Sequence, residues 1–123
     1  MTGGRDYGDQ DRVNAALEQA HDILCGDGEP PMLIHGGASG ADALAAKYAH
    51  AHYWPTTVFP ANWWRHGKAA GPRRNQQMAN TTADLMADPG DAVCVVFPGG
   101  RGTADMVRRA EAAGIRVVFA GER

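Results

Sequence analysis

The sequence has no long apolar run, few cysteines and no excess of basic residues. No stretch approaches the roughly 18 apolar residues of a membrane span, and Met1 to Gly4 lack the apolar segment of a signal peptide. The two cysteines, Cys25 and Cys94, stand in no Cys-X-X-Cys or Cys/His ligand spacing, which indicates reduced thiols. We therefore expect a cytoplasmic protein without membrane contact.

Several functional classes lack their signatures here. A formal net charge of −2 and a pI of about 6.2 argue against a general duplex-DNA binder. A Walker A motif and a Gly-X-Ser-X-Gly elbow are absent, and Ser39 is the only serine. The histidines show no metal-ligand spacing. These absences disfavour a P-loop nucleotide triphosphatase, a serine hydrolase, a metal site and a bound cofactor.

The length and the apolar content fit one globular domain, residues 1–123. The chain has 123 residues and is 44% hydrophobic, which suffices for a packed core. Apolar periodicity and turn residues predict helices at 9–24, 40–52, 72–86 and 103–113, strands at 31–35, 56–59, 91–97 and 115–120, and an irregular segment at 61–71.

This alternation predicts an α/β fold, a three-layer α/β/α arrangement with a mostly parallel sheet. In such folds a strand normally precedes the first helix, and Gly3-Gly4 has the composition of the turn that ends one. Only Met1 and Thr2 come before that turn, so we expect a truncated first strand. An edge left exposed in the sheet favours a homo-oligomer.

Three glycine-rich turns follow real or expected strands, at 3–7, 35–42 and 98–103. The carboxyl ends of parallel strands lie along one edge of the sheet, where ligands bind. Glycine lets the backbone approach a bound group, and helix N-termini favour phosphate. The predicted ligand-binding residues are Gly3, Gly4, Arg5, Gly36, Gly37, Ser39, Gly40, Arg74, Asn75, Gly99, Gly100, Arg101, Gly102 and Thr103.

Three carboxylates near these turns are candidates for a catalytic role. Asp6, Asp42 and Asp105 could each bond a ribose hydroxyl or act as a general base. A purely structural role in turns or at helix starts explains these aspartates equally well. For Asp42, capping of the following helix is the better explanation. The segment 63–75 combines two tryptophans with clustered basic residues, which suits a base and phosphates.

Four motifs, GGRDY, HGGASGAD, WWRHGKAAGPRRNQQM and FPGGRGTADM, occur in this order. Together they resemble the YspA-type, cpYpsA-related branch of the SLOG superfamily, which also contains the DprA/Smf proteins and the lonely-guy (LOG) phosphoribohydrolases. The resemblance implies a Rossmann-like fold and a nucleotide or nucleotide-derived ligand related to ADP-ribose. Residues 98–103 match the start of the LOG motif PGGxGTxxE, but its catalytic glutamate falls on Met106.

Three functions are consistent with these features. The first is binding of a nucleotide-like phosphate compound by a sensor or sequestering protein. The second is cleavage of the N-glycosidic bond of a nucleoside monophosphate, which would need one of the three carboxylates. The third is binding of single-stranded DNA through the segment 63–75, as in the DprA relatives; the acidic overall charge disfavours nucleic acid as a partner.

Overall fold

The computed structural model describes residues 1–26 and 28–120. The described chain alternates helices and short strands. In chain order these are α1 (Gln10–Leu24), β1 (Leu33–His35), α2 (Ala41–Ala51), β2 (Thr56–Val58), α3 (Trp63–His66), the 3-10 turn η1 (Gly67–Ala69), α4 (Ala70–Leu85), β3 (Val93–Val96), α5 (Arg101–Ala112) and β4 (Arg116–Phe119).

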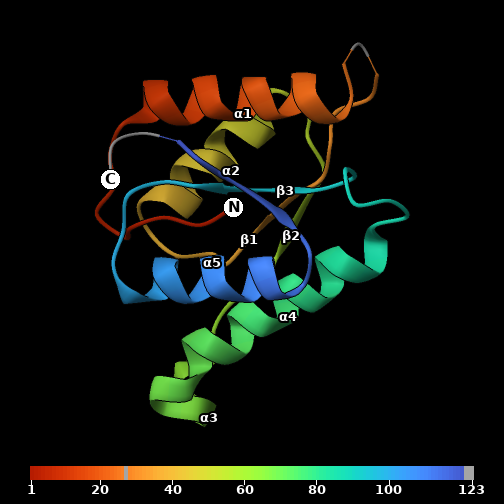
Figure 1. Ribbon diagram of the computed structural model, residues 1–123. Coiled ribbons are helices and arrows are strands. Elements are labelled where there is room, and N and C mark those ends of the chain that lie inside the picture. The colour runs from red at the N-terminus through yellow and green to blue at the C-terminus, as the bar shows by residue number, and fades with distance from the viewer. Residues whose placement is uncertain (27, 121–123) are drawn as a thin grey trace.

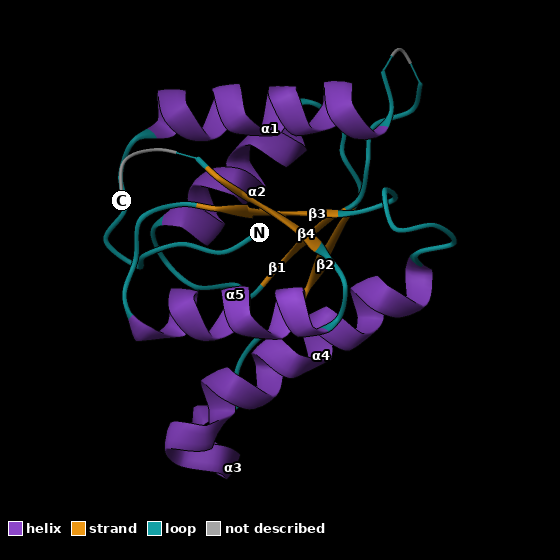
Figure 2. Ribbon diagram, viewed as in Figure 1, coloured by secondary structure: helices purple, strands orange, loops and turns teal. Residues whose placement is uncertain are grey.

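The helices lie on both sides of the strands (Figure 1). Helices α1 and α2 cover one side, and α4 and α5 cover the other, with α3 beyond the end of α4 (Figure 2). Helix α1 packs on α2 and β3, whereas α4 packs on α5 and β1. The mixed α/β class and the parallel direction of the strands are as the alternation predicts.

All strand pairs are parallel, but they do not form one regular sheet. Strand β1 pairs with β2, and β3 pairs with β4, which gives two two-stranded sheets. Met1 and Thr2 lie between the two pairs. The Met1 amino group donates to the carbonyl oxygen of Ile34 at 3.0 Å, and Thr2 forms an isolated parallel bridge with Val96. Met1 and Thr2 thus lie at the place between the pairs where the strand expected ahead of Gly3 would end.

Two apolar clusters fill the space on either side of the strands. One contains Val13 and Leu17 of α1, alanines of α2, and Phe97. The other contains Met78 of α4, Met106 of α5 and Ile115. Strand β3 supplies Val95 to the first cluster and its neighbours Cys94 and Val96 to the second, since successive side chains of a strand point to opposite faces. This two-sided burial explains why the sequence of β3 is continuously apolar.

The prediction of irregular structure at 61–71 is wrong. Helix α3 begins at Trp63, where the side chain of Asn62 accepts a hydrogen bond from the Arg65 N–H at 3.0 Å. Asparagine is a strong helix-capping residue, and four residues suffice for the turn it starts. Helix α4 begins at Ala70, so Pro72 lies within its first turn, where no N–H donor is needed.

Candidate functional site

The turns after Thr2 and after β1 touch each other directly. The Ala41 N–H donates to the Gly4 carbonyl oxygen at 3.0 Å, and the Ser39 hydroxyl donates to the Arg5 carbonyl oxygen at 3.0 Å. Gly40 has a φ of +71°, and a Cβ there would collide with the backbone of Gly4 and Arg5. Position 40 therefore requires glycine both for its conformation and for its space.

The turn after β3 meets the same segment. The Gly4 N–H donates to the Pro98 carbonyl oxygen at 2.9 Å. A Cβ on Gly99 would lie 2.7 Å from the Gly4 nitrogen and would also collide with the Thr103 hydroxyl. All three glycine-rich turns thus converge on Gly4, at the carboxyl ends of the parallel strands.

A hollow of about 520 Å³ lies beside this junction. Its walls come from the first turn, the start of α2, segment α3–α4 and the start of α5. The residues that line it are Thr2, Gly3, Gly4, Arg5, Ala38, Asp42, Trp63, Lys68, Gly71, Pro72, Arg74, Asn75, Met78, Gly100, Arg101, Gly102, Thr103, Asp105 and Arg108.

The lining of the hollow is strongly cationic, although the chain as a whole is slightly acidic. Five of the lining side chains are basic and two are acidic; the basic ones are Arg5, Lys68, Arg74, Arg101 and Arg108. The whole chain carries a formal charge of −2. Positive charge is therefore concentrated at this place, which favours an anion.

Arg74 links α4 to the turn after β1. Its Nη1 donates to the Gly36 carbonyl oxygen at 2.7 Å, and its Nε donates to Asn75 Oδ1 at 3.0 Å. Burial lowers the pKa of Arg74, an effect that the charge of Asp42 opposes and that of Arg5 reinforces. The guanidinium is thus held in place by protein contacts at the wall of the hollow.

Asn75 and Asp105 connect α4 to α5. The buried Asn75 amide donates to the Gly102 carbonyl oxygen at 3.2 Å and to Asp105 Oδ2 at 3.0 Å. Asp105 also accepts from Arg109 Nε at 2.8 Å and from Arg108 Nη2 at 3.2 Å. Partial burial raises the pKa of Asp105, but the hydrogen bonds from Arg109 and Asn75 outweigh it and hold this pKa below its usual value. Asp105 is therefore an ion-paired carboxylate.

Asp42 and His35 shape the turn after β1. The buried Asp42 accepts on Oδ2 from the N–H groups of Gly36 and Ala38, each at 3.2 Å. His35 Nδ1 accepts from the Gly37 N–H at 2.9 Å. Burial lowers the pKa of His35, with Asp42 acting in the opposite direction. Both side chains thus bind backbone N–H groups of the turn.

The N-terminus of α5 opens toward the hollow. Its N-cap residue, Gly100, has no side chain, so the first N–H groups of this twelve-residue helix have no side-chain cap. Cβ atoms on Gly100 or Gly102 would meet nothing within 4 Å. These two glycines leave the helix start accessible to a bound group.

Trp63 forms an aromatic wall. The Arg5 guanidinium carbon lies 5.1 Å from the centroid of its ring, within the range of a cation–π contact. A Cβ on Gly71 would lie 3.2 Å from the Trp63 ring. Trp63 is 47% exposed, whereas the neighbouring Trp64 is 95% exposed and contributes nothing to the hollow.

Most of the sequence-predicted residues line the hollow, and the others build the turns behind it. Those in the lining are Gly3, Gly4, Arg5, Arg74, Asn75, Gly100, Arg101, Gly102 and Thr103, with the carboxylates Asp42 and Asp105. Those outside the lining are Asp6, Gly36, Gly37, Ser39, Gly40 and Gly99. Sequence reasoning missed Arg108, although its spacing of three from Asp105 on a helix predicts that the two side chains meet.

The part of the chain that the structure describes holds neither a metal-binding cluster nor a membrane-spanning helix. Across 1–26 and 28–120, no group of three or more His, Cys, Asp and Glu side chains is arranged to hold a metal ion. In the same ranges, no helix has the length and apolar character to cross a membrane.

The fold and the hollow define a mixed α/β protein with short parallel strands and a cationic site among its turns. A family model described as "YspA, cpYpsA-related SLOG family" matches residues 1–66. The chain is also 34% identical over 131 residues to the "Gene 61 protein" of Mycobacterium phage D29, covering 100% of this chain and 95% of the phage protein. The chain therefore belongs to the YspA, cpYpsA-related SLOG family. No solved structure matches it.

Proposed function

We propose that this protein binds a nucleotide-like phosphate compound in the hollow beside Gly4 and acts as a sensor or a sequestering protein. The observation that carries the proposal is the uncapped N-terminus of α5, which faces a hollow whose basic side chains outnumber its acidic ones by five to two. Family membership suggests a Rossmann-like domain with a nucleotide-related role. A volume of about 520 Å³ falls within the usual range of small-molecule sites.

The phosphate belongs at the glycine turns. The N–H groups of Arg101, Gly102 and Thr103 begin α5, where the helix dipole favours negative charge. The guanidinium groups of Arg101 and Arg74 provide paired donors suited to phosphate oxygens. The remaining predicted residues do not line the hollow but hold the three glycine-rich turns close to one another. They are Gly36, Gly37, Ser39, Gly40 and Gly99.

The base belongs beside Trp63. This ring is half exposed at the wall of the hollow and already has one cationic neighbour, Arg5. Aromatic side chains stack on every nucleobase, typically contributing about 1–3 kcal/mol per base. Binding through phosphate and stacking would use Trp63 and the glycine turns as parts of one site.

The hydrogen bonds of the carboxylates at the hollow favour ligand binding without cleavage of the ligand. Asp105 is committed to Arg109, Arg108 and Asn75, and Asp42 holds two backbone N–H groups. Met106, at the position of the LOG glutamate, is buried in the apolar cluster between α4 and α5. N-glycosidic cleavage requires a proton donor or acceptor at the hollow, so we expect no free base when a nucleoside monophosphate is incubated with the protein.

Isothermal titration calorimetry against nucleoside mono- and diphosphates and ADP-ribose tests the proposal. We expect at least one phosphorylated compound to bind, and its dephosphorylated nucleoside to bind at least tenfold more weakly. Arg101→Ala should weaken binding about tenfold, equivalent to about 1.4 kcal/mol. Arg116→Ala is the matched control, because Arg116 is exposed on β4 and outside the hollow. Equal affinity for nucleoside and nucleotide would refute a phosphate site.

A further inference from the structure

Asp42 is a buried carboxylate in a hollow whose other charges favour an anion. It lies just after the start of α2, lines the hollow and is 7% exposed. The other carboxylate of the lining, Asp105, is paired with Arg108 and Arg109. Across residues 1–26 and 28–120, in contrast, no cationic nitrogen lies within 4.0 Å of an Asp42 oxygen. Because this negative charge repels phosphate, Asp42 faces a different part of the ligand.

One oxygen of Asp42 is enough for its structural role. Oδ2 alone accepts the N–H groups of Gly36 and Ala38 and so fixes the turn after β1. Oδ1 has no hydrogen-bond partner among the described residues. In the same part of the chain, the one side-chain polar atom that is both shielded from solvent and without a partner is Gln10 Oε1. Asp42 Oδ1 is therefore an acceptor that is open to the hollow.

Arg74 has a free donor beside this acceptor. Its Nη1 and Nε are bonded to Gly36 and Asn75, whereas Nη2 has no partner among the described residues and is not fully shielded from solvent. Asp42 and Arg74 bond to the N–H and the C=O of the same residue, Gly36, so the two side chains are neighbours. They form no ion pair with each other. The hollow thus holds an acceptor and a donor side by side, and neither satisfies the other.

We propose that Asp42 Oδ1 and Arg74 Nη2 bind the two adjacent hydroxyls of a ribose, so that the ligand is a ribonucleotide. One hydroxyl donates to Asp42 Oδ1, and the oxygen of the other accepts from Arg74 Nη2. Nη2 carries two N–H groups, so this bond leaves one for a phosphate oxygen. The inference rests on the proposed function, because it names the sugar of the compound whose phosphate lies at the start of α5. An alcohol is too weak an acid to give its proton to a carboxylate, so the contact leaves the ligand intact.

A pair of hydroxyls suits these two atoms better than a charged group does. A second phosphate would be repelled by Asp42, and a cation would be repelled by the five basic side chains of the lining. A nucleobase edge also offers a donor beside an acceptor, but the base belongs at Trp63. In a nucleotide the ribose joins the base to the phosphate, so it is the part that lies between Trp63 and the start of α5.

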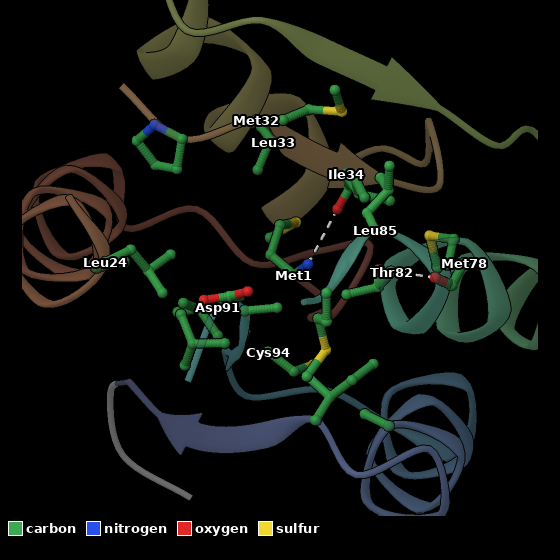
Figure 3. Close-up of a pocket in the computed structure, with 18 of the residues that line it drawn as sticks. Met1, Leu24, Met32, Leu33, Ile34, Met78, Thr82, Leu85, Asp91 and Cys94 are labelled. Atoms are coloured by element: carbon green, nitrogen blue, oxygen red, sulfur yellow. Dashed lines mark hydrogen bonds between the residues drawn. The ribbon is translucent and has the colours of Figure 1, made fainter. Parts of the chain in front are cut away.

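A second cavity, of about 420 Å³, lacks the polar character that a sugar needs. Its lining is mainly apolar, and Figure 3 shows Met32, Leu33 and Leu85 there. The Thr82 hydroxyl, which also lines it, donates to the Met78 carbonyl oxygen at 2.8 Å within α4. A sugar would lose its bonds to water in this space and gain few in return, which is costly. Recognition of a ribose therefore belongs to the hollow.

Calorimetric titration with ADP and with 2′,3′-dideoxy-ADP tests the ribose site. The two probes share the base and the phosphates and differ only in the two hydroxyls. We expect ADP to bind at least about tenfold more tightly, as is usual for sites that bond a hydroxyl of their ligand. Equal affinities would overturn the ribose site and leave the phosphate site intact. Binding of neither probe would refute the proposed function and the ribose site together.

Asp42→Asn tests whether the preference for ADP comes from Asp42. Asparagine keeps one oxygen for the N–H groups of Gly36 and Ala38 but turns the atom that faces the hollow from an acceptor into a donor. The preference should fall to about threefold or less, whereas Asp84→Asn, exposed on α4 and outside the hollow, should keep it. A merely structural defect would weaken both probes equally. A preference that is unchanged in Asp42→Asn would overturn the role of Asp42.

The ¹³C NMR signals of the aspartate carboxyl carbons provide a measurement on the unaltered protein, which does not depend on the folding of a variant. At saturation, ADP should shift the signal of Asp42, 2′,3′-dideoxy-ADP should leave it in place, and the signal of Asp84 should not respond to either probe. An equal shift of the Asp42 signal with both probes would show that Asp42 responds to something other than the hydroxyls, and it would overturn the proposal.

Discussion

Arg74 Nη1 donates a 2.7 Å hydrogen bond to the carbonyl oxygen of Gly36, across 38 positions of sequence. The guanidinium also occupies the space that a Cβ on Gly36 would take. Because Gly36 has no side chain, the Arg74 guanidinium can lie against it, and this contact determines the position of one positive charge at the wall of the hollow. This contact ties α4 to the turn after β1, so the geometry of the proposed phosphate site depends on a residue that does not line it.

Gly36→Ala should weaken nucleotide binding by displacing Arg74. We expect about a tenfold loss of affinity, similar to that of Arg74→Ala, and little further loss when the two substitutions are combined, because both remove the same positioned charge. Calorimetric titration of the two single variants and the double variant measures this coupling. Fully additive losses would show that Gly36 and Arg74 act separately. Gly90→Ala is the control, since a Cβ there meets nothing within 4 Å.

Two adjacent glycines should respond differently to alanine. A Cβ on Gly99 collides with the Thr103 side chain and the Gly4 nitrogen, whereas one on Gly100 meets nothing. Gly99→Ala should therefore lower the free energy of unfolding by about 1–3 kcal/mol, the usual cost of overpacking. Gly100→Ala should cost less, about 0.5 kcal/mol, because alanine is a poorer N-cap residue than glycine but meets no other atom. Urea denaturation of both variants compares them. Equal stabilities would contradict the close packing of the turn after β3 on Gly4.

His35 should make the protein less stable below neutral pH. Burial lowers its pKa in the folded state, with Asp42 opposing, so below about pH 6.5 the unfolded chain binds a proton that the folded chain does not. The free energy of unfolding then falls as pH decreases, by at most about 1.4 kcal/mol per pH unit from this group. His35→Asn removes the titration and keeps an oxygen acceptor for the Gly37 N–H.

Denaturation of the wild type and His35→Asn at pH 7.5, 6.5 and 5.5 measures this difference. The other histidines are common to both proteins, so their titration cancels in the comparison. A stability gap between the two proteins that stays constant with pH would mean that His35 titrates normally in the folded state.

Asp105 should contribute stability that is lost only in acid. Its pKa is lowered in the folded state because the hydrogen bonds from Arg109 and Asn75 outweigh burial, so its contribution is present above the unfolded value of about 3.9 and disappears as pH falls through the folded value. Asp105→Asn should cost about 1–2 kcal/mol at pH 7.

The stability difference between the wild type and Asp105→Asn should shrink as pH falls below about 4. Asp84→Asn, an exposed position on α4, is the control and should change stability by less than about 0.5 kcal/mol. A loss for Asp105→Asn that is unchanged in acid would point to a packing defect rather than to a lost charge.

Much of the architecture follows from local sequence patterns. The 3.6-residue periodicity of α1 predicts an apolar side of Val13, Ala16, Leu17, Ala20 and Leu24. Val13, Leu17 and Ala20 are buried, whereas Ala16 and Leu24 are only partly buried. The continuous apolar run of β3 predicts burial on both faces, which its two clusters confirm. These features are predictable because each depends on residues within one element.

The features that the sequence did not predict depend on contacts between distant elements. Helix α3 is too short to show a period, and its start depends on one capping side chain, that of Asn62. The contact between the two pairs of strands depends on Met1 and Thr2, which bond to β1 and β3, respectively. The role of Gly36 depends on Arg74, which comes 38 positions later.

The most direct measurement of the central claim is an NMR titration of protein labelled with [¹⁵N]glycine, using ADP-ribose as the ligand and ribose as the uncharged control. Binding at the converged turns predicts that ADP-ribose shifts the amide signals of Gly4, Gly100 and Gly102, whereas Gly8, Gly90 and Gly114 remain unchanged. Ribose should shift none of them. Absence of any shift at millimolar ADP-ribose, or shifts confined to glycines outside the hollow, would contradict the account.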